Sequence, residues 1–360
     1  MLYRLSASRQ RAEILERLFP DGPDALPRLE DPLAQGHTLN ALALAYQFRG
    51  EPQLAVPLFR RCFAIFEREG DRRNAAVLLC NLSESLRRAG KPREAERMAR
   101  LALSLCRKQQ DHLQEAVSLQ WIGLTLALCG NERLSETGLR RALAIFSLRR
   151  NEQSEGVVTA FLAQRLHWLG EPAAALPVAQ HAWELARIDR AELDFIRAAG
   201  LYGTAALVLG DLGTAGERLG HTLTRARAVN LFEEELPALA ALAELHRRKQ
   251  EYTDTRDLLD HIWELARRGP YPTFHADALN VLAQIERDQR NHDAAVAAAT
   301  QAYVLAWCDG PPYAYHYGLT NARKHLAALG APLPVLPPFD PARFEPLPEV
   351  ELNPDDEFHV

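Results

Sequence analysis

The chain has 360 residues, of which 47% are apolar and 25% charged, a composition typical of a folded protein and not of a disordered one. The formal net charge of −5 argues against a dedicated nucleic-acid binder. No apolar run approaches the ~18 residues that a membrane helix needs, and residues 1–10 lack the apolar core of a secretory signal. Five cysteines, an odd number spread over a long chain, favour reduced thiols. We therefore expect a cytoplasmic protein with no nucleic-acid partner and no membrane partner.

The first thirty residues predict a short amphipathic helix followed by a linker. Residues 6–19 place Ile14, Leu15 and Leu18 on one helix face, and prolines interrupt residues 20–32. We expect residues 1–30 to form an N-terminal capping helix and its linker.

From residue 31 the sequence repeats itself with a period of forty residues. Gly50 recurs every forty residues as far as Gly210, and the small residues at positions 43 and 55 recur in every unit. Seven segments that obey one spacing indicate tandem structural repeats. The units are 31–70, 71–110, 111–150, 151–190, 191–230, 231–270 and 271–310.

Each unit predicts two amphipathic helices. In the first unit, Leu39, Leu42 and Tyr46 share one helix face, and a second apolar face follows the turn marked by Gly50 and Pro52. Glycine suits a left-handed helix cap, and proline suits the first turn of the next helix. A lone helix pair leaves apolar faces unburied, so the units must stack into an all-α solenoid.

Two further sets of equivalent positions in the repeats, here called columns, predict how the helices begin and cross. Aspartate or asparagine precedes the first helix of the first four units and can cap its exposed amides; these residues are Asp31, Asp71, Asp111 and Asn151. The small residues Ala43 and Ala55 are expected where the two helices of a pair approach most closely.

After the seventh unit the chain changes character. Residues 311–330 predict a C-terminal capping helix, and residues 331–360 form a tail with eight prolines, seven acidic residues and one base. We expect Phe339 and Phe344 to pack on the array. The acidic end then either stays free or lies among the arginines of the inner groove as an internal ligand.

The spacing of Ala43, Tyr46, Ala55 and Phe59 resembles the tetratricopeptide-repeat (TPR) pattern, and the forty-residue period is similar to its kinesin-light-chain-like type. The resemblance covers about residues 31–330. It implies a right-handed α-solenoid of seven helix hairpins with capping helices at both ends. Residues 18–22, the turn at 307–312 and the proline-rich ending also resemble the C-terminal sensor arrays of bacterial STAND signalling NTPases, which are related to NLR immune receptors.

A search for catalytic motifs favours a protein that is not an enzyme. Gly90-Lys91 is followed by Pro92 and has no glycine five residues before it, so it predicts a helix–helix turn and not a phosphate loop. His181, His221 and His261 share one column of the second helix, where a polar outer face is the favoured interpretation over a metal ladder. We expect no catalytic residues, no metal and no cofactor.

Columns that vary between units point to a recognition surface on the concave face. Amides there can bind a peptide backbone, and arginines can hold a carboxylate through two hydrogen bonds, which suits an extended peptide. A solvated polar face remains the alternative, and core filling is the favoured role for Trp121. The candidate residues are His37, Asn40, Gln47, Asn81, Glu84, Arg87, Arg88, Gln120, Trp121, Gln164, His167, Trp168, Arg197, Glu244, Arg247, Arg248, Asn280, Gln284 and Arg287.

Three hypotheses for function follow. The first is a protein- or peptide-binding scaffold, which the resemblance makes the ligand-sensing module of a STAND-type signalling or antiviral-defence protein. It implies an NTPase or effector domain on another chain or on an absent segment. The second is a ligand-gated regulator that binds a signalling peptide or a small metabolite, in the style of TPR peptide-pheromone receptors. The third is a static assembly scaffold.

Overall fold

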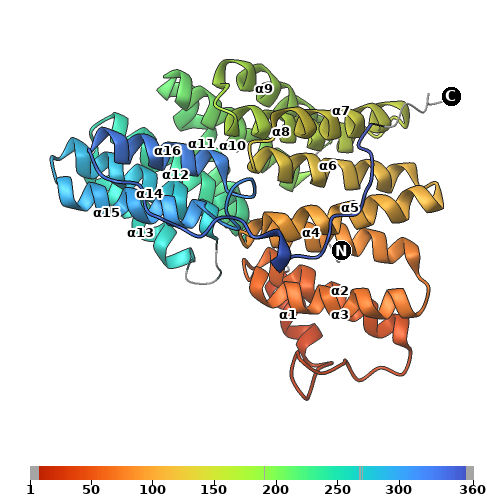
Figure 1. Cartoon of the computed structure of the whole chain (residues 1–360). Coiled ribbons are helices and arrows are strands. Elements are labelled where there is room, and N and C mark those ends of the chain that lie inside the picture. The colour runs from red at the N-terminus through yellow and green to blue at the C-terminus, as the bar shows by residue number, and fades with distance from the viewer. Residues whose placement is uncertain (1–7, 190, 267–268, 270, 354–360) are drawn as a thin grey trace.

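The computed structural model describes residues 8–189, 191–266, 269 and 271–353, and in this part of the chain the regular structure is entirely helical (Figure 1). The first helices of the seven pairs are α2 (Pro32–Phe48), α4 (Arg72–Arg88), α6 (His112–Leu128), α8 (Glu152–Trp168), α10 (Glu192–Leu209), α12 (Phe232–Arg248) and α14 (Pro272–Asp288). The second helices are α3 (Pro52–Arg68), α5 (Pro92–Gln109), α7 (Glu132–Leu148), α9 (Pro172–Asp189), α11 (Leu212–Ala228), α13 (Tyr252–Ala266) and α15 (His292–Ala306). The predicted all-α solenoid is confirmed.

Helices at the two ends complete the array. α1 (Ser8–Glu16) packs on α2, and α16 (His316–Ala328) packs on α14 and α15. A short 3₁₀ helix, η2 (Pro341–Arg343), lies in the segment after α16. None of the helices in the described part of the chain combines the length and apolar character needed to cross a lipid bilayer.

The helix ends follow the chemistry that the sequence predicts. The side chains of Asp31, Asp71, Asp111 and Asn151 each accept a hydrogen bond from the backbone N–H three residues on. The glycines from Gly50 to Gly210 that end the first helices have positive φ angles. Gln250 and Arg290 take the same left-handed conformation without being glycine, so the turn geometry is kept in all seven units.

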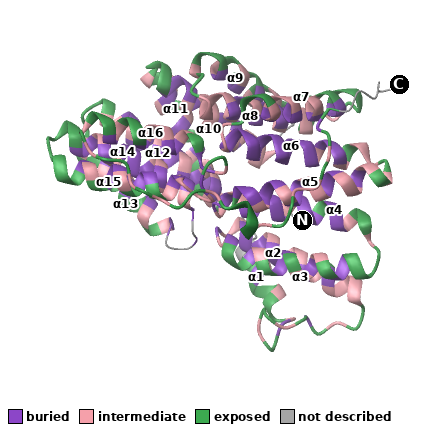
Figure 2. Ribbon diagram, viewed as in Figure 1, coloured by how far each residue is buried: buried purple, intermediate pink, exposed green. Residues whose placement is uncertain are grey.

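The two small columns meet where the helices of a pair cross. Ala43 and Ala55 are fully buried, and Ser83 donates a hydrogen bond to the backbone oxygen of Ala95, which holds the position equivalent to Ala55. A β-carbon on Gly123 would lie 3.0 Å from the backbone oxygen of Ser135 in the third pair. Close helix approach is therefore the physical reason for the small residues, as predicted. Figure 2 shows the resulting burial along first helices such as α4 and α6.

The solenoid winds far enough for its last units to touch its first ones. The turns that end α2, α4 and α6 lie against the beginnings of α12, α14 and α16, over sequence separations of more than 180 residues. A β-carbon on the turn glycine would lie within 3.3 Å of the opposite side chain at each contact; the pairs are Gly50 with Phe232, Gly90 with Pro272 and Gly130 with His316. Leu128, near the end of α6, joins an apolar cluster built mainly by α14, α15 and α16. The first units and the last units therefore meet across the inner face, a contact that the repeat pattern did not predict.

Residues 331–353, here called the C-terminal strap, cross from the last units to the first (Figure 1). The Trp307 side chain donates a hydrogen bond of 2.9 Å to the backbone oxygen of Pro337. Phe339 packs on Tyr313 with ring centroids 5.0 Å apart and stacks on Phe344 at 5.3 Å. The two phenylalanines therefore pack on the array, as the sequence predicts.

The rest of the strap follows α5. Arg93 donates to the backbone oxygen of Glu345 (2.8 Å), Arg97 pairs with the Glu345 carboxylate, and Arg107 donates to the backbone oxygen of Glu351 (2.6 Å). Leu352 is buried in the apolar core of the N-terminal units. The hypothesis that the acidic end lies in the inner groove is wrong for residues 331–353, because the strap binds the arginines of α5. Residues 354–360 lie outside the described part.

Candidate functional site

The inner face contains a partly open cavity of about 380 Å³, here called the chamber, lined mainly by first helices of the pairs and by α16. Its walls bring together most of the residues that the sequence singled out on the concave face. Those lining it are Glu84, Arg87, Arg88, Trp121, Gln164, His167, Trp168, Arg197, Glu244, Arg248, Asn280 and Gln284. The remaining candidates, which do not line it, are His37, Asn40, Gln47, Asn81, Gln120, Arg247 and Arg287.

One wall of the chamber is an ion-pair network that joins distant units. Arg88, only 5% exposed, pairs with Glu84 one turn earlier and with Glu233 at the start of α12, both at 2.7 Å. Arg197 pairs with Glu234 at 2.8 Å. Burial raises the pKa of Glu233 against the opposing charge of Arg88, whereas the charges of Arg88 and Arg197 outweigh burial and lower the pKa of Glu84. The network helps to hold the second unit against the sixth.

Several of the predicted recognition residues are already engaged by the protein itself. The Gln47 amide donates to Glu84 (3.1 Å) and accepts from Ser85 (2.7 Å). Arg247 is held by Glu244 and Asp288, so it is a structural residue in this conformation. Charged and amide side chains on the inner face are therefore not all available to a ligand.

Other candidates make neighbouring contacts within the array. Arg248 binds Glu244 and the backbone oxygen of Leu207. His37 lies against Phe66, with ring centroids 5.1 Å apart. Trp121, 9% exposed, packs on Phe161 at 5.4 Å, so most of its surface fills the core and a small part lines the chamber.

Arg87 differs from the other arginines of the chamber. Its side chain has no hydrogen-bond or ion-pair partner among the described residues, and its Nε is buried. Burial, reinforced by the neighbouring charge of Arg88, lowers the pKa of Arg87 to about 10. The guanidinium keeps its positive charge at neutral pH and offers unused donors to an acidic group inside the chamber.

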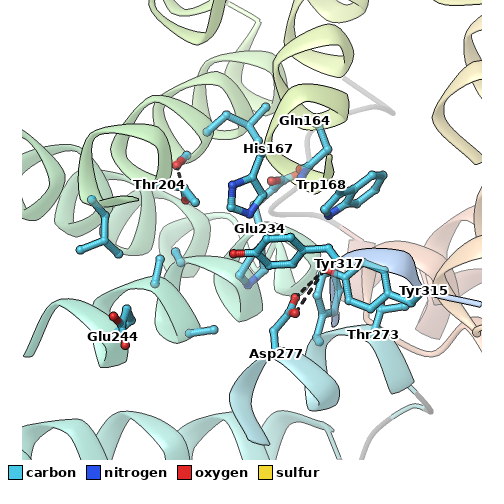
Figure 3. Close-up of a pocket in the computed structure, with 18 of the residues that line it drawn as sticks. Gln164, His167, Trp168, Thr204, Glu234, Glu244, Thr273, Asp277, Tyr315 and Tyr317 are labelled. Atoms are coloured by element: carbon cyan, nitrogen blue, oxygen red, sulfur yellow. Dashed lines mark hydrogen bonds between the residues drawn. The ribbon is translucent and has the colours of Figure 1, made fainter. Parts of the chain in front are cut away.

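A second feature of the chamber is a cluster of aromatic side chains from α8 and from the segment that begins α16, next to α14 (Figure 3). This cluster is here called the aromatic end. Trp168 meets the Tyr315 ring edge-on at 6.1 Å, and His167 packs on Tyr317 at 4.7 Å. The Tyr315 hydroxyl donates to Asp277, with distances of 3.0 and 3.2 Å to the two carboxylate oxygens. Burial raises the pKa of Asp277 to about 7 and lowers that of His167 to about 4, so the histidine is neutral at physiological pH.

Sequence reasoning missed the contribution of the C-terminal cap to this site. Tyr315, Tyr317, Asn321 and His325 line the chamber, although residues 311–330 were expected only to close the end of the array. Glu233 was also absent from the candidate set. Its inward register on α12 could be read from the sequence, but a single acid in a first helix does not reveal that the chain folds back on it.

Comparison with known proteins supports the fold. A tetratricopeptide-repeat family model matches residues 35–108, the first two units. A crystal structure of a Rap protein complexed with Competence and Sporulation Factor matches with a TM-score of 0.64 at 15% identity, over 91% of this chain and 87% of that one. The remaining five units share the period and the left-handed turn after the first helix with the first two. Residues 35–108 therefore match the tetratricopeptide-repeat family, and the whole chain has the fold of such helix-pair arrays.

Two further solved structures resemble this chain. Aspartyl phosphate phosphatase F from Bacillus subtilis matches with a TM-score of 0.56 at 12% identity, covering 77% of this chain and 72% of that one. A STAND protein with a tetratricopeptide-repeat sensor from Pyrococcus horikoshii has a TM-score of 0.44 at 13% identity, over 91% of this chain and 53% of that one. A search of curated protein sequences gave no match.

Candidate metal ligands in the described part of the chain are sparse. His246, Glu251 and Asp254 bring their ligand atoms within 4.8 Å of one another, but the two acids are exposed and His246 already bonds Glu251 at 2.6 Å. The column of His181, His221 and His261 is exposed on three successive second helices, which agrees with the polar outer face favoured from the sequence. Neither group lines the chamber.

Proposed function

We propose that this protein is a non-catalytic regulator that encloses a short peptide or a small molecule in its chamber. The observation that carries the proposal is the closure of the first units on the last ones around a cavity that retains unpaired polar groups. A ligand inside touches both halves of the superhelix, so its binding free energy acts on the equilibrium between closed and open forms. Ligand occupancy would then alter the surface that the protein offers to a partner.

The size of the chamber supports a small ligand over a long one. A volume of about 380 Å³ falls in the range of small-molecule sites. A cavity of this volume accommodates a small molecule or a few residues of a peptide. The Rap structure with TM-score 0.64 was solved with Competence and Sporulation Factor bound, which shows that a related solenoid takes a ligand.

The cytoplasm is the proposed location. All five cysteines are free, and Cys80 and Cys106 both approach the Ser118 hydroxyl, at 3.5 and 3.7 Å, without forming a disulfide. Burial raises the pKa of the Cys80 thiol to about 12, which keeps it protonated. These are features of a protein that works in a reducing compartment.

A sensor role beside a STAND-type NTPase is the second candidate. It is supported by the sequence resemblance of residues 18–22 and 307–312, and it requires an NTPase or effector domain on another chain or segment. Affinity purification from source cells, with the captured proteins identified by mass spectrometry, tests it. A nucleotide-binding partner that leaves when the chamber ligand is added supports this role, and its absence counts against it.

The main proposal is tested by filling the chamber. Thr204 lines it on α10, so Thr204→Trp should occupy the ligand volume. The protein is purified from source-cell extract without denaturation, and retained molecules are detected by native mass spectrometry. Wild type should retain a defined ligand that Thr204→Trp lacks.

A matched control places the same ring on the outside. His221 is exposed on α11, and His221→Trp should retain the ligand as wild type does. Equal retention by Thr204→Trp, or no retained ligand in wild type, would overturn the proposal.

A further inference from the structure

The aromatic end of the chamber contains a half-buried carboxylate that has no counter-cation among the described residues. Asp277 points from α14 toward the tyrosines of the cap (Figure 3), and its only hydrogen-bond donor among the described residues is the Tyr315 hydroxyl. A carboxylate has about four lone-pair positions, and a single hydroxyl cannot fill them. The arginines in ion pairs along the chamber are bound to other acids, so none of them neutralises Asp277.

A second acceptor lies one helical turn further along α14. Asn280 is 4% exposed, and its amide nitrogen donates to the backbone oxygen of Gly318 at 3.1 Å. That bond fixes the orientation of the amide, because only the nitrogen can donate to a carbonyl. The amide oxygen is then buried without a partner in the described structure. A buried acceptor left unpaired destabilises the fold, so a donor that reaches this oxygen would be favoured.

Aromatic rings surround the two acceptors. Tyr315 and Tyr317 lie 6.4 Å apart between ring centroids, and Trp168 meets Tyr315 edge-on. The faces of such rings attract cations, most strongly where water is excluded. His167, which packs on Tyr317, is neutral because burial lowers its pKa to about 4, so it brings no competing charge.

We propose that this end of the chamber, the Asp277 pocket (Asp277, Asn280, Trp168, Tyr315 and Tyr317), binds a primary ammonium or guanidinium group of the ligand. The inference rests on the proposed ligand-binding function and adds the chemistry of one ligand group. The cation faces the aromatic rings, donates one N–H to the Asp277 carboxylate and donates another to the Asn280 amide oxygen. Tyr315 keeps its bond to Asp277 and orients the carboxylate.

The alternative role for Asp277 is to satisfy the buried hydroxyl of Tyr315 and nothing else. That role leaves the orphaned oxygen of Asn280 unexplained, since Asn280 does not contact the hydroxyl. Asp277 and Asn280 offer two independent acceptors on the same face of α14, and the aromatic rings beside them have no cation partner in the described structure. A bound N–H cation would explain both observations. A cation beside Asp277 would also return its pKa from about 7 toward the usual range.

The experiment uses four small probes on the full chain, with binding measured by calorimetry and ligand-observed NMR. Phenethylammonium and agmatine carry N–H cations, 2-phenylethanol is a neutral analogue of the first, and tetramethylammonium is a cation without N–H. Wild type should bind phenethylammonium at least 10-fold more tightly than 2-phenylethanol and should bind tetramethylammonium weakly. In ¹³C NMR, phenethylammonium should lower the pKa of the Asp277 carboxyl.

Two variants provide the controls. Asp277→Asn keeps the acceptor for Tyr315 but removes the charge, so it should lose the preference for phenethylammonium while 2-phenylethanol binds as before. Asp277→Glu should recover part of the preference. Equal binding of charged and neutral probes, tetramethylammonium binding as tightly as phenethylammonium, or an unaltered preference in Asp277→Asn would each overturn the inference.

The outcome also separates this inference from the proposed function. If 2-phenylethanol binds wild type and is excluded by Thr204→Trp but shows no charge preference, the chamber is a ligand site and only the cation assignment is wrong. If no probe binds and Thr204→Trp retains the same cellular molecules as wild type, both proposals fail.

Discussion

Arginines on the inner wall and arginines on α5 look alike in the sequence but have different roles. On α5, Arg93, Arg97 and Arg107 are occupied by the C-terminal strap, which supplies backbone oxygens and the Glu345 carboxylate. On the inner wall, Arg88 is fixed between two glutamates, whereas its neighbour Arg87 has no partner in the described structure.

The difference shows that the density of positive charge on a solenoid is a poor guide to its ligand. Arginines on a surface of the array can be paired within the chain, either by the C-terminal strap or by acidic residues of a distant unit. The informative residue is the one that stays unpaired although it is buried. Arg87 has no partner and Asp277 has no counter-cation among the described residues, so these two side chains of opposite charge mark where a ligand would add contacts.

The largest effect should come from breaking the inner network at its centre. Arg88→Gln leaves Glu84 and Glu233 buried without their cation, so we expect a loss of about 3–5 kcal/mol in unfolding free energy. Urea and thermal unfolding measure the change. Arg68→Gln, in an exposed pair with Glu69, is the matched control and should change stability by less than about 0.5 kcal/mol. Equal behaviour of the two variants would mean that the inner network does not hold the closed form.

Removing the strap tests the outer arginines. Deletion of residues 335–360 exposes the surfaces now covered by Phe339, Phe344 and Leu352, and should lower the unfolding free energy by about 3 kcal/mol. The substitution Val335→Ser, at a fully solvent-exposed strap position, should leave the melting temperature unchanged. An unchanged melting temperature in the deletion would show that the strap contributes no net stability.

Asp277 gives a pH-dependent effect of intermediate size. Its folded-state pKa of about 7 lies above the ordinary 3.8, so folding favours the protonated form and wild type loses stability as the pH rises from about 4 to 7. Asp277→Asn avoids this cost. The variant should be more stable than wild type at pH 8 by on the order of 2 kcal/mol, and the gain should vanish near pH 4. Parallel melting curves across this range would contradict a buried, uncompensated carboxylate.

Arg87→Gln should give the smallest change in stability, within about 0.5 kcal/mol, because no described ion pair is lost. The ligands retained in native mass spectra should nevertheless shift away from those carrying an acidic group. Arg88→Gln, one position along, is the comparison. A stability loss as large as that of Arg88→Gln would mean that Arg87 is structural.

Much of the fold follows from the sequence because each unit repeats its own local rules. The N-cap at Asp31, the left-handed turn at Gly50 and the crossing of Ala43 with Ala55 depend on residues within one pair. Closure depends instead on a small rotation between neighbouring units, which accumulates over the array and is recorded in no single column. That is why the sequence predicted the helix pairs and their stacking but not the contact between the first and the last units.

The site divides in the same way. Inward positions such as Arg87 and Trp168 could be located from helix register, and both line the chamber. The partners of inward residues could not be predicted, because those of Arg88 and Trp168 come from units far away in the sequence. The strap shows the same limit: its phenylalanines predicted packing, but nothing in its composition distinguished the α5 arginines from the inner ones.

The glycines that end the first helices carry a consequence for the length of the array. Gly50, Gly90 and Gly130 are each pressed against a residue of a later unit, whereas Gly170 and Gly210 have open space around them. These three contacts therefore mark the number of repeats after which the superhelix comes back against its first units. Inserting or removing one forty-residue unit between them and α12 would rotate every later helix past its contact. In this protein the copy number of the repeat is as much a determinant of the interior as any side chain within it.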